Sequence, residues 1–141
     1  MPHLDGLKVL FVAGFGPLVR EPAKSRAFYA DTLGLPLEPM PQNDDYLHSE
    51  TLSGVRHFAL WPLAEAAKSC FGTDEWPASV QTPHSWLEFD VENVESATTV
   101  LKERGYALLV EARKEPWGQT VTRMLSPEGV LIGITFTPWL R

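Results

Sequence analysis

The feature that most constrains the fold is an internal repeat, because the second half of the chain reproduces the pattern of the first. In each half the apolar pattern predicts a strand, a helix and then three further strands. The glycines that end the two predicted helices, Gly34 and Gly105, lie 71 positions apart, and Ser25 and Ser96 keep the same offset. One such module is too small to bury both faces of its sheet. We therefore expect two modules to share one curved sheet, with the helices on its outer face.

The first half contains clear strand and helix signals. Residues 8–13 form a short, apolar, β-branched run that predicts a buried strand. A helix is expected over residues 23–33, because Pro22 suits a first helical position and Gly34 ends the run. Three candidate strands follow, at residues 35–40, 46–52 and 55–61.

The second half repeats this order after a connecting segment. Residues 63–83 are predicted to be a linker with a short alanine-rich helix. A helix over residues 94–104 is expected to be capped by Asn93. Strands are predicted at residues 86–91, 106–111, 120–125 and 130–137. We therefore expect one α+β domain over residues 1–141, made of two βαβββ modules at about 6–62 and 84–141, with the linker between them.

Charge and cysteine content exclude several classes of protein. The net charge is -6 and the isoelectric point is about 5.1, which argues against binding to a nucleic-acid backbone. The single cysteine, Cys70, cannot form an internal disulfide and fits a reducing compartment. The sequence shows neither a long apolar run nor a secretory leader pattern. We expect a cytoplasmic protein with neither nucleic acid nor a membrane as partner.

Three short motifs carry a resemblance to a known superfamily. Residues 28–35 (FYADTLGL) end the first helix, residues 115–118 (EPWG) precede a strand, and residues 126–129 (SPEG) form a predicted turn. In this order they resemble motifs of the vicinal-oxygen-chelate superfamily, which includes glyoxalases, extradiol dioxygenases and bleomycin-resistance proteins; the second motif is closest to the bleomycin-resistance branch. Ser126 departs from the superfamily's Asp-Pro-Asp-Gly turn. The resemblance implies a curved mixed sheet around a cup-shaped cavity, commonly in a homodimer.

The resemblance also implies where a metal would be bound. Metal enzymes of the superfamily place His, Gln or Glu at equivalent points of four strands, and counting from the motifs puts these points on Gly14, Leu60, Trp86 and Gly133. Divalent metals in such sites need imidazole nitrogens or carboxylate oxygens. None of the four side chains supplies either, so we expect no metal cofactor at these positions and no other cofactor.

Strand alternation predicts which side chains line the cavity. For the strand at residues 55–61 it points His57 outward. For the strand at residues 86–91 it places Trp86 inward, either as a plug of the cup or as a platform for a planar ligand. The predicted ligand-binding residues are Arg56, Phe58, Leu60, Trp86, Glu88, Asp90 and, by the resemblance, Trp117.

Two carboxylates are the candidates for chemistry. Glu88 and Asp90 are two residues apart and therefore about 7 Å apart on one face of a regular strand. They can receive a cationic ligand or act as a general base. The alternative is a pair of carboxylates at the cavity rim, neutralised by Arg56 or Arg123.

Three functional hypotheses follow. The first is a metal-free protein that binds, and sequesters, an aromatic or cationic small molecule in the cavity, as bleomycin-resistance proteins do. The second is a metal-dependent glyoxalase-like lyase or dioxygenase whose ligands lie at residues other than those counted. The third is a metal-free acid–base enzyme that uses Glu88 or Asp90.

Overall fold

The structure is a computed structural model, and it describes residues 5–141. The strands are β1 (Val9–Val19), β2 (Glu38–Met40), β3 (Asn43–Ser49), β4 (Phe58–Pro62), β5 (Ser85–Val91), β6 (Val110–Lys114), β7 (Thr120–Leu125) and β8 (Leu131–Phe136). The helices are α1 (Pro22–Arg26), the π-helix η1 (Ala27–Thr32), α2 (Leu63–Phe71), α3 (Val94–Glu103) and the 3-10 helix η2 (Pro138–Leu140). Within residues 5–141, no helix is long and apolar enough to cross a membrane.

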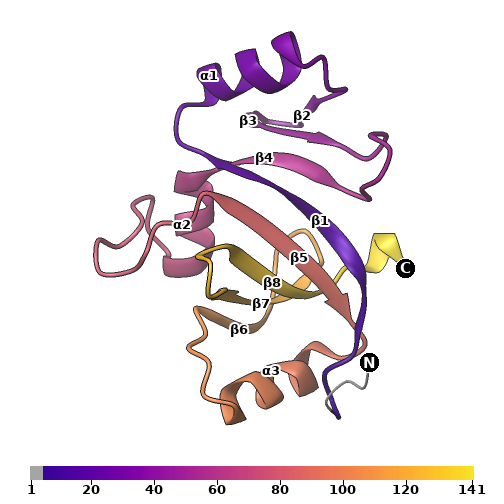
Figure 1. Cartoon of the computed structure of the whole chain (residues 1–141), viewed down its shortest axis with the longest axis vertical. Helices are drawn as coiled ribbons and strands as arrows, with labels where there is room; N and C mark the ends of the chain where they lie inside the picture. Colours follow the sequence, from indigo (N-terminus) through magenta and orange to yellow (C-terminus); the bar gives the residue numbers. More distant parts are fainter. Residues whose placement is uncertain (1–4) are drawn as a thin grey trace.

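All eight strands join one mixed sheet in the order β2-β3-β4-β1-β5-β8-β7-β6. At its centre β1 pairs antiparallel with β5, and each of these strands has a parallel neighbour, β4 for β1 and β8 for β5. The order outward from the centre is the same in both halves, and Figure 1 shows α1 and α3 at opposite ends of the molecule. The α+β fold with paired βαβββ modules, predicted from the repeat, is confirmed.

The helix-facing side of the sheet is packed in two apolar clusters. In the first half, Val19, Leu47, Phe58 and Leu60 are buried together, and Tyr29 of η1 packs against them. In the second half, the cluster is made by Val91, Val94, Ala97 and Ile134. The Asn93 side chain caps α3 by accepting the Ser96 N–H at 2.9 Å, as the sequence predicts. The other face packs in part against α2, in a third cluster that includes Trp61, Trp86, Ala66 and Cys70, and the rest of that face lines a cavity.

The elements differ from the predicted ones mainly at their ends. Strand β1 continues through both of its glycines to Val19, instead of stopping at residue 13. The helix predicted over 23–33 is α-helical only to Arg26 and then widens, with the Leu33 N–H bonded to the Phe28 carbonyl at 3.0 Å. Strand β6 begins at Val110, not at residue 106. Gly and apolar patterning locate elements well, but their ends depend on tertiary contacts.

Cys70 lies on α2 and is 8% exposed. Burial raises the pKa of its thiol above the ordinary value. Since the thiolate is the reactive form, we expect Cys70 of the folded protein to react with dithionitrobenzoate at pH 8 on the order of tenfold or more slowly than in urea. Stopped-flow absorbance measures both rates. Equal rates in the two solvents would contradict the buried position of this helix face.

Candidate functional site

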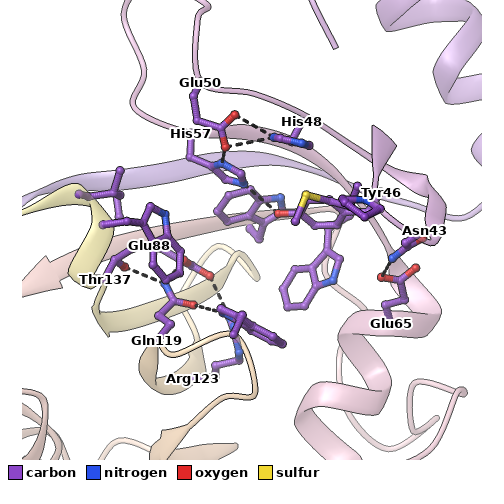
Figure 2. Close-up of a pocket in the computed structure, with 18 residues that line it drawn as sticks. Asn43, Tyr46, His48, Glu50, His57, Glu65, Glu88, Gln119, Arg123 and Thr137 are labelled. Atoms are coloured by element: carbon purple, nitrogen blue, oxygen red, sulfur yellow. Dashed lines mark hydrogen bonds and ion pairs between the residues drawn. The ribbon is translucent and has the colours of Figure 1, made fainter. Parts of the chain in front are cut away.

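The face of the sheet opposite the two helix-facing clusters encloses a cavity of about 460 Å³ (Figure 2). This is within the range of about 300–1,000 Å³ typical of small-molecule sites. Its walls combine aromatic rings with carboxylates, amides and imidazoles. The lining residues are Ala13, Met40, Pro41, Asn43, Tyr46, His48, Glu50, His57, Trp61, Glu65, Trp86, Glu88, Trp117, Gln119, Arg123, Thr137, Trp139 and Leu140.

Four tryptophans form much of the apolar lining. Trp86 is only 3% exposed and meets Trp61 edge-to-face, with ring centroids 6.3 Å apart. These two rings are fixed by packing. Trp117 and Trp139 are 51% and 56% exposed, so they stand at the rim. The cavity therefore has a rigid aromatic base and an open aromatic edge.

The Trp86 indole is held at the base of the cavity by a hydrogen bond to a β4 carbonyl for which β1 has no backbone donor. In the parallel ladder of β1 and β4, the Phe15 N–H donates to the His57 carbonyl at 3.1 Å. The next donor along β1 is Pro17, which has no N–H. The indole N–H of Trp86 instead donates to the Ala59 carbonyl at 3.1 Å. The indole thus takes the place of a missing backbone donor.

Two of the four positions at which the resemblance places metal ligands, Gly14 and Gly133, have no room for a side chain. A Cβ added at Gly14 would lie 2.5 Å from the His57 carbonyl oxygen and 3.1 Å from Cη2 of Trp86. A Cβ added at Gly133 would lie 2.7 Å from Cγ of Glu88. No metal-binding side chain fits at either glycine. The residues present do not suit the superfamily's metal centre.

Glu88 belongs to a polar network on one side of the cavity. The Gln119 amide donates to Glu88 Oε1 at 3.0 Å and to Thr137 Oγ1 at 2.8 Å, and the Trp117 indole donates to Gln119 Oε1 at 3.0 Å. Arg123, 1% exposed, donates to Glu88 Oε2 at 3.2 Å. Both carboxylate oxygens of Glu88 are thus held by donors. Arg123 is the neutralising partner weighed from the sequence; Gln119 was not predicted.

Asp90 does not reach the cavity. It is fully buried, and its carboxylate accepts from Thr135 Oγ1 at 2.5 Å, the Thr137 N–H at 2.9 Å and Thr137 Oγ1 at 2.8 Å. Arg141 Nε adds a fourth donor at 3.1 Å. Asp90 therefore anchors the end of β8 and the C-terminal arginine. Glu88 lines the cavity, whereas Asp90 is a buried structural residue.

The alternation predicted for β4 is wrong by one residue. His57 and Trp61 line the cavity, whereas Phe58 and Leu60 are packed in the helix-facing cluster with Val19 and Leu47. The run from Phe58 to Trp61 is apolar at every position, so its own pattern does not indicate a face. The structure does not bring Phe58 or Leu60 to the cavity.

Arg56 does not line the cavity either. Its guanidinium carbon lies 3.9 Å from the centroid of the Phe11 ring, and its Nη1 donates to the Leu140 carbonyl at 3.0 Å. Of the seven predicted ligand-binding residues, the structure therefore places three on the cavity lining: Trp86, Glu88 and Trp117.

A second polar group, which sequence reasoning missed, lies at the edge of the cavity (Figure 2). His48 Nδ1 is 2.8 Å from Glu50 Oε2, and His57 Nδ1 is 2.8 Å from Glu50 Oε1. One donor atom from each of the three side chains lies within 4.8 Å of the other two. The available signal was the spacing of His48 and Glu50 on one face of a strand.

Tyr46 connects this group to the cavity wall. Its hydroxyl is 2.9 Å from His57 Nε2. Burial raises the pKa of Tyr46 far above its ordinary value, and the negative charges of Glu88 and Glu50 add to the effect. The hydroxyl donates to His57 Nε2 or accepts from it, according to the tautomer of the imidazole.

The charge balance of the lining is acidic. Glu50, Glu65 and Glu88 face a single arginine, Arg123. Burial raises the pKa of Glu65, while the Asn43 amide that donates to it at 2.9 Å opposes this shift. The described lining therefore carries three carboxyl groups and one guanidinium.

Known structures share this architecture at low sequence identity. Methylmalonyl-CoA epimerase from Mycobacterium tuberculosis is 23% identical with a TM-score of 0.59, and the match covers 94% of this chain and 91% of that one. A methylmalonyl-CoA epimerase from Streptomyces coelicolor is 17% identical with a TM-score of 0.59, over 93% and 96% of the two chains. A glyoxalase/bleomycin resistance protein/dioxygenase superfamily member from Vibrio splendidus 12B01 is 18% identical with a TM-score of 0.54, over 92% and 97%. These likenesses establish the fold.

The sequence comparison is more specific about the family. A comparison with curated proteins finds no match. The family model described as a glyoxalase-like domain matches residues 15–137, which is most of the chain and includes both modules of the sheet. The chain therefore belongs to the glyoxalase-like domain family.

Proposed function

We propose that the protein binds an aromatic cation in the cavity and holds it without converting it. The observation that carries this proposal is the pairing of exposed rim tryptophans, Trp117 and Trp139, with an acidic interior. Planar cations are attracted to the faces of tryptophan rings, and carboxylates beneath the rings add a charge attraction. The likeness of residues 115–118 to the bleomycin-resistance motif supports sequestration as the biological use.

The two candidate acid–base residues support binding better than turnover. The carboxylate of Asp90 is buried beneath four donors and does not line the cavity. Each oxygen of Glu88 already accepts a hydrogen bond, from Gln119 and from Arg123. A general base must come within hydrogen-bond reach of the substrate proton, and these two bonds hold the Glu88 carboxylate in the cavity wall. Glu88 is therefore a fixed part of the binding surface.

A series of ligands matched in shape tests the proposal. N-methylquinolinium, 2-methylnaphthalene and 2-naphthoate have similar fused rings but carry positive, zero and negative charge. We expect the cation to quench tryptophan fluorescence at the lowest concentration, and to stabilise the fold by about 2.7 kcal/mol at a hundredfold excess over its Kd. Equal or tighter binding of 2-naphthoate would contradict the proposed charge preference.

Trp117→Ala tests the location of the site. Since cation–π contacts contribute about 0.5–2 kcal/mol, we expect the affinity for N-methylquinolinium to fall about tenfold. Tyr106→Ala is the matched control, because Tyr106 is also an exposed aromatic residue, 49% exposed, and does not line the cavity. Isothermal titration calorimetry gives both affinities. Equal affinities of the two variants would place the binding site elsewhere.

A further inference from the structure

The side chains of His48, Glu50 and His57 form a cluster at the rim of the cavity, and Glu50 is one of the three carboxylates of the lining. We propose that these three residues bind a divalent transition metal, Zn²⁺ or an ion of similar ligand preference, at the rim of the cavity. None of the three stands at the positions where the superfamily resemblance places metal ligands, Gly14, Leu60, Trp86 and Gly133. A bound divalent ion would offset the negative charge that Glu50 gives the lining, so the charge preference for organic ligands is measured on the metal-free protein.

The β3–β4 hairpin brings the three side chains to one face. The strands are antiparallel, with Ser49 opposite Phe58, so the register continues with Glu50 opposite His57. His48 and Glu50 are two residues apart and therefore share a face of the hairpin. His48 and Glu50 thus come from the end of β3, and His57 comes from the facing position just before β4. The backbone register itself assembles the site.

The turn after β3 is fixed by a buried serine. Ser49 is 3% exposed, and its hydroxyl accepts the backbone N–H groups of Thr51 and Leu52, each at 3.1 Å. These bonds hold the chain immediately after Glu50. A ligand set on such an element is better preorganised than one on an unsupported loop.

The donor atoms have the chemistry and spacing that a metal needs. Two imidazole nitrogens and a carboxylate oxygen are ligands that suit Zn²⁺, Ni²⁺ and Cu²⁺. One atom from each residue lies within 4.8 Å of the other two. Metal–ligand bonds of about 2.0–2.2 Å allow two ligands of one ion to be at most about 4.2 Å apart. Small side-chain rotations are enough to close the set around an ion.

Glu50 has no competing guanidinium or ammonium partner among residues 5–141. Its carboxylate is bonded by His48 and His57. Arg56, the arginine in the same hairpin loop, instead contacts the Phe11 ring and the Leu140 carbonyl. A carboxylate placed between two imidazoles, with the nearby arginine directed elsewhere, is available to a metal cation.

Tyr46 supplies the outer partner that metal-binding histidines usually have. With a metal on Nδ1, the proton of His57 is on Nε2, which donates to the Tyr46 hydroxyl at 2.9 Å. The rings of His48 and His57 are nearly parallel, with an interplanar angle of 26°. Outer partners of this kind orient the ring and raise metal affinity about 10–100-fold. Tyr46 is therefore a positioning residue for the proposed site.

Three protein ligands leave a coordination position open. Structural zinc sites have four protein ligands, whereas sites that take an exogenous ligand have three. All three residues line the cavity, so the open position faces the space that a small molecule would occupy. The proposed metal would bind water there, or an oxygen or nitrogen atom of a ligand in the cavity.

Titration of the metal-free full chain with Co²⁺ tests the site directly. Co²⁺ reports low-coordinate nitrogen and oxygen ligation by its visible absorption, and Zn²⁺ added afterwards should displace it. We expect one Co²⁺ per chain with micromolar or tighter affinity. Zinc X-ray absorption of the wild-type protein should show two imidazoles bound to the ion. Failure of Co²⁺ to bind, or fewer than two imidazoles, would overturn the proposal.

Variants assign the ligands. His48→Ala and His57→Ala are each expected to weaken Co²⁺ binding at least about 100-fold, and Tyr46→Phe about tenfold. His84→Ala is the control, since His84 is exposed and does not line the cavity. Circular dichroism checks that each variant is folded. An equal loss in His84→Ala, or unchanged binding in both ligand variants, would contradict the assignment. The readout involves no organic ligand, so it is independent of the aromatic-cation proposal.

Discussion

Gly16→Ala is expected to destabilise the protein by about 3 kcal/mol or more, because a side chain there overlaps the backbone of the neighbouring strand. A Cβ at Gly16 would lie 1.9 Å from the Ala59 carbonyl oxygen and 2.9 Å from its carbonyl carbon. It would also approach Trp86 Nε1 at 3.1 Å. The two nearest atoms belong to the backbone, which cannot adopt another rotamer as a flexible side chain can. Relief requires β1 and β4 to separate beneath the cavity.

Urea unfolding followed by circular dichroism measures this loss, and Gly54→Ala is its control. Gly54 has a φ of +93°, and no atom lies within 4 Å of a Cβ added there, so alanine is strained without a clash. We expect the control to cost about 1 kcal/mol. If both variants lose the same stability, the close approach of the two strands at Gly16 is not present in solution.

Asp90→Ala is expected to cost about 3–5 kcal/mol, the usual penalty for removing one partner of a buried ion pair. The substitution leaves the Thr137 N–H without its acceptor and the Arg141 guanidinium without its carboxylate. A buried donor without an acceptor is destabilising, because the same donor is hydrogen-bonded to water in the unfolded chain. The segment after β8 should also loosen, since Asp90 is what ties it to β5.

Glu92→Ala is the matched control for this prediction. Glu92 is also an acidic residue at the end of β5, but its side chain is 67% exposed and lies 3.8 Å from Lys8. Pairs of this kind contribute about 0–1 kcal/mol. Hydrogen exchange at the Thr137 amide gives a local readout beside the urea midpoint. An Asp90→Ala midpoint equal to that of Glu92→Ala would show that the buried network contributes little.

The architecture could be predicted from the sequence because it repeats. Gly34 and Gly105 end equivalent helices, Asn93 caps the second one, and each half has the same order of elements. Such signals are local in the chain and need no tertiary information. They were enough to place two modules in one sheet. The strand ends and the π-helical turn at residues 27–32 depend on packing between elements, and local patterns do not contain it.

The site was harder to predict, because it depends on register. Trp86 and Glu88 alternate in β5 with Leu87 and Phe89, and their inward direction follows from that pattern. In β4 every residue from Phe58 to Trp61 is apolar, so the prediction chose the wrong face and turned His57 outward. With His57 outward, His48 and Glu50 had no third partner. The hairpin register that joins them is a tertiary property, and Asp90 was likewise misplaced because its four donors come from later in the chain.

The indole at the base of the cavity also affects which evolutionary paths are open to this chain. A histidine cannot first appear at Gly14, because its side chain would meet the Trp86 ring at 3.1 Å and the His57 carbonyl at 2.5 Å. Replacing Trp86 first by a smaller residue is also destabilising. The Ala59 carbonyl would lose its donor, and a void would form at the base of the cavity. Each single substitution therefore destabilises the fold. Gly14 and Trp86 are epistatic, because the residue present at each position makes the other costly to change.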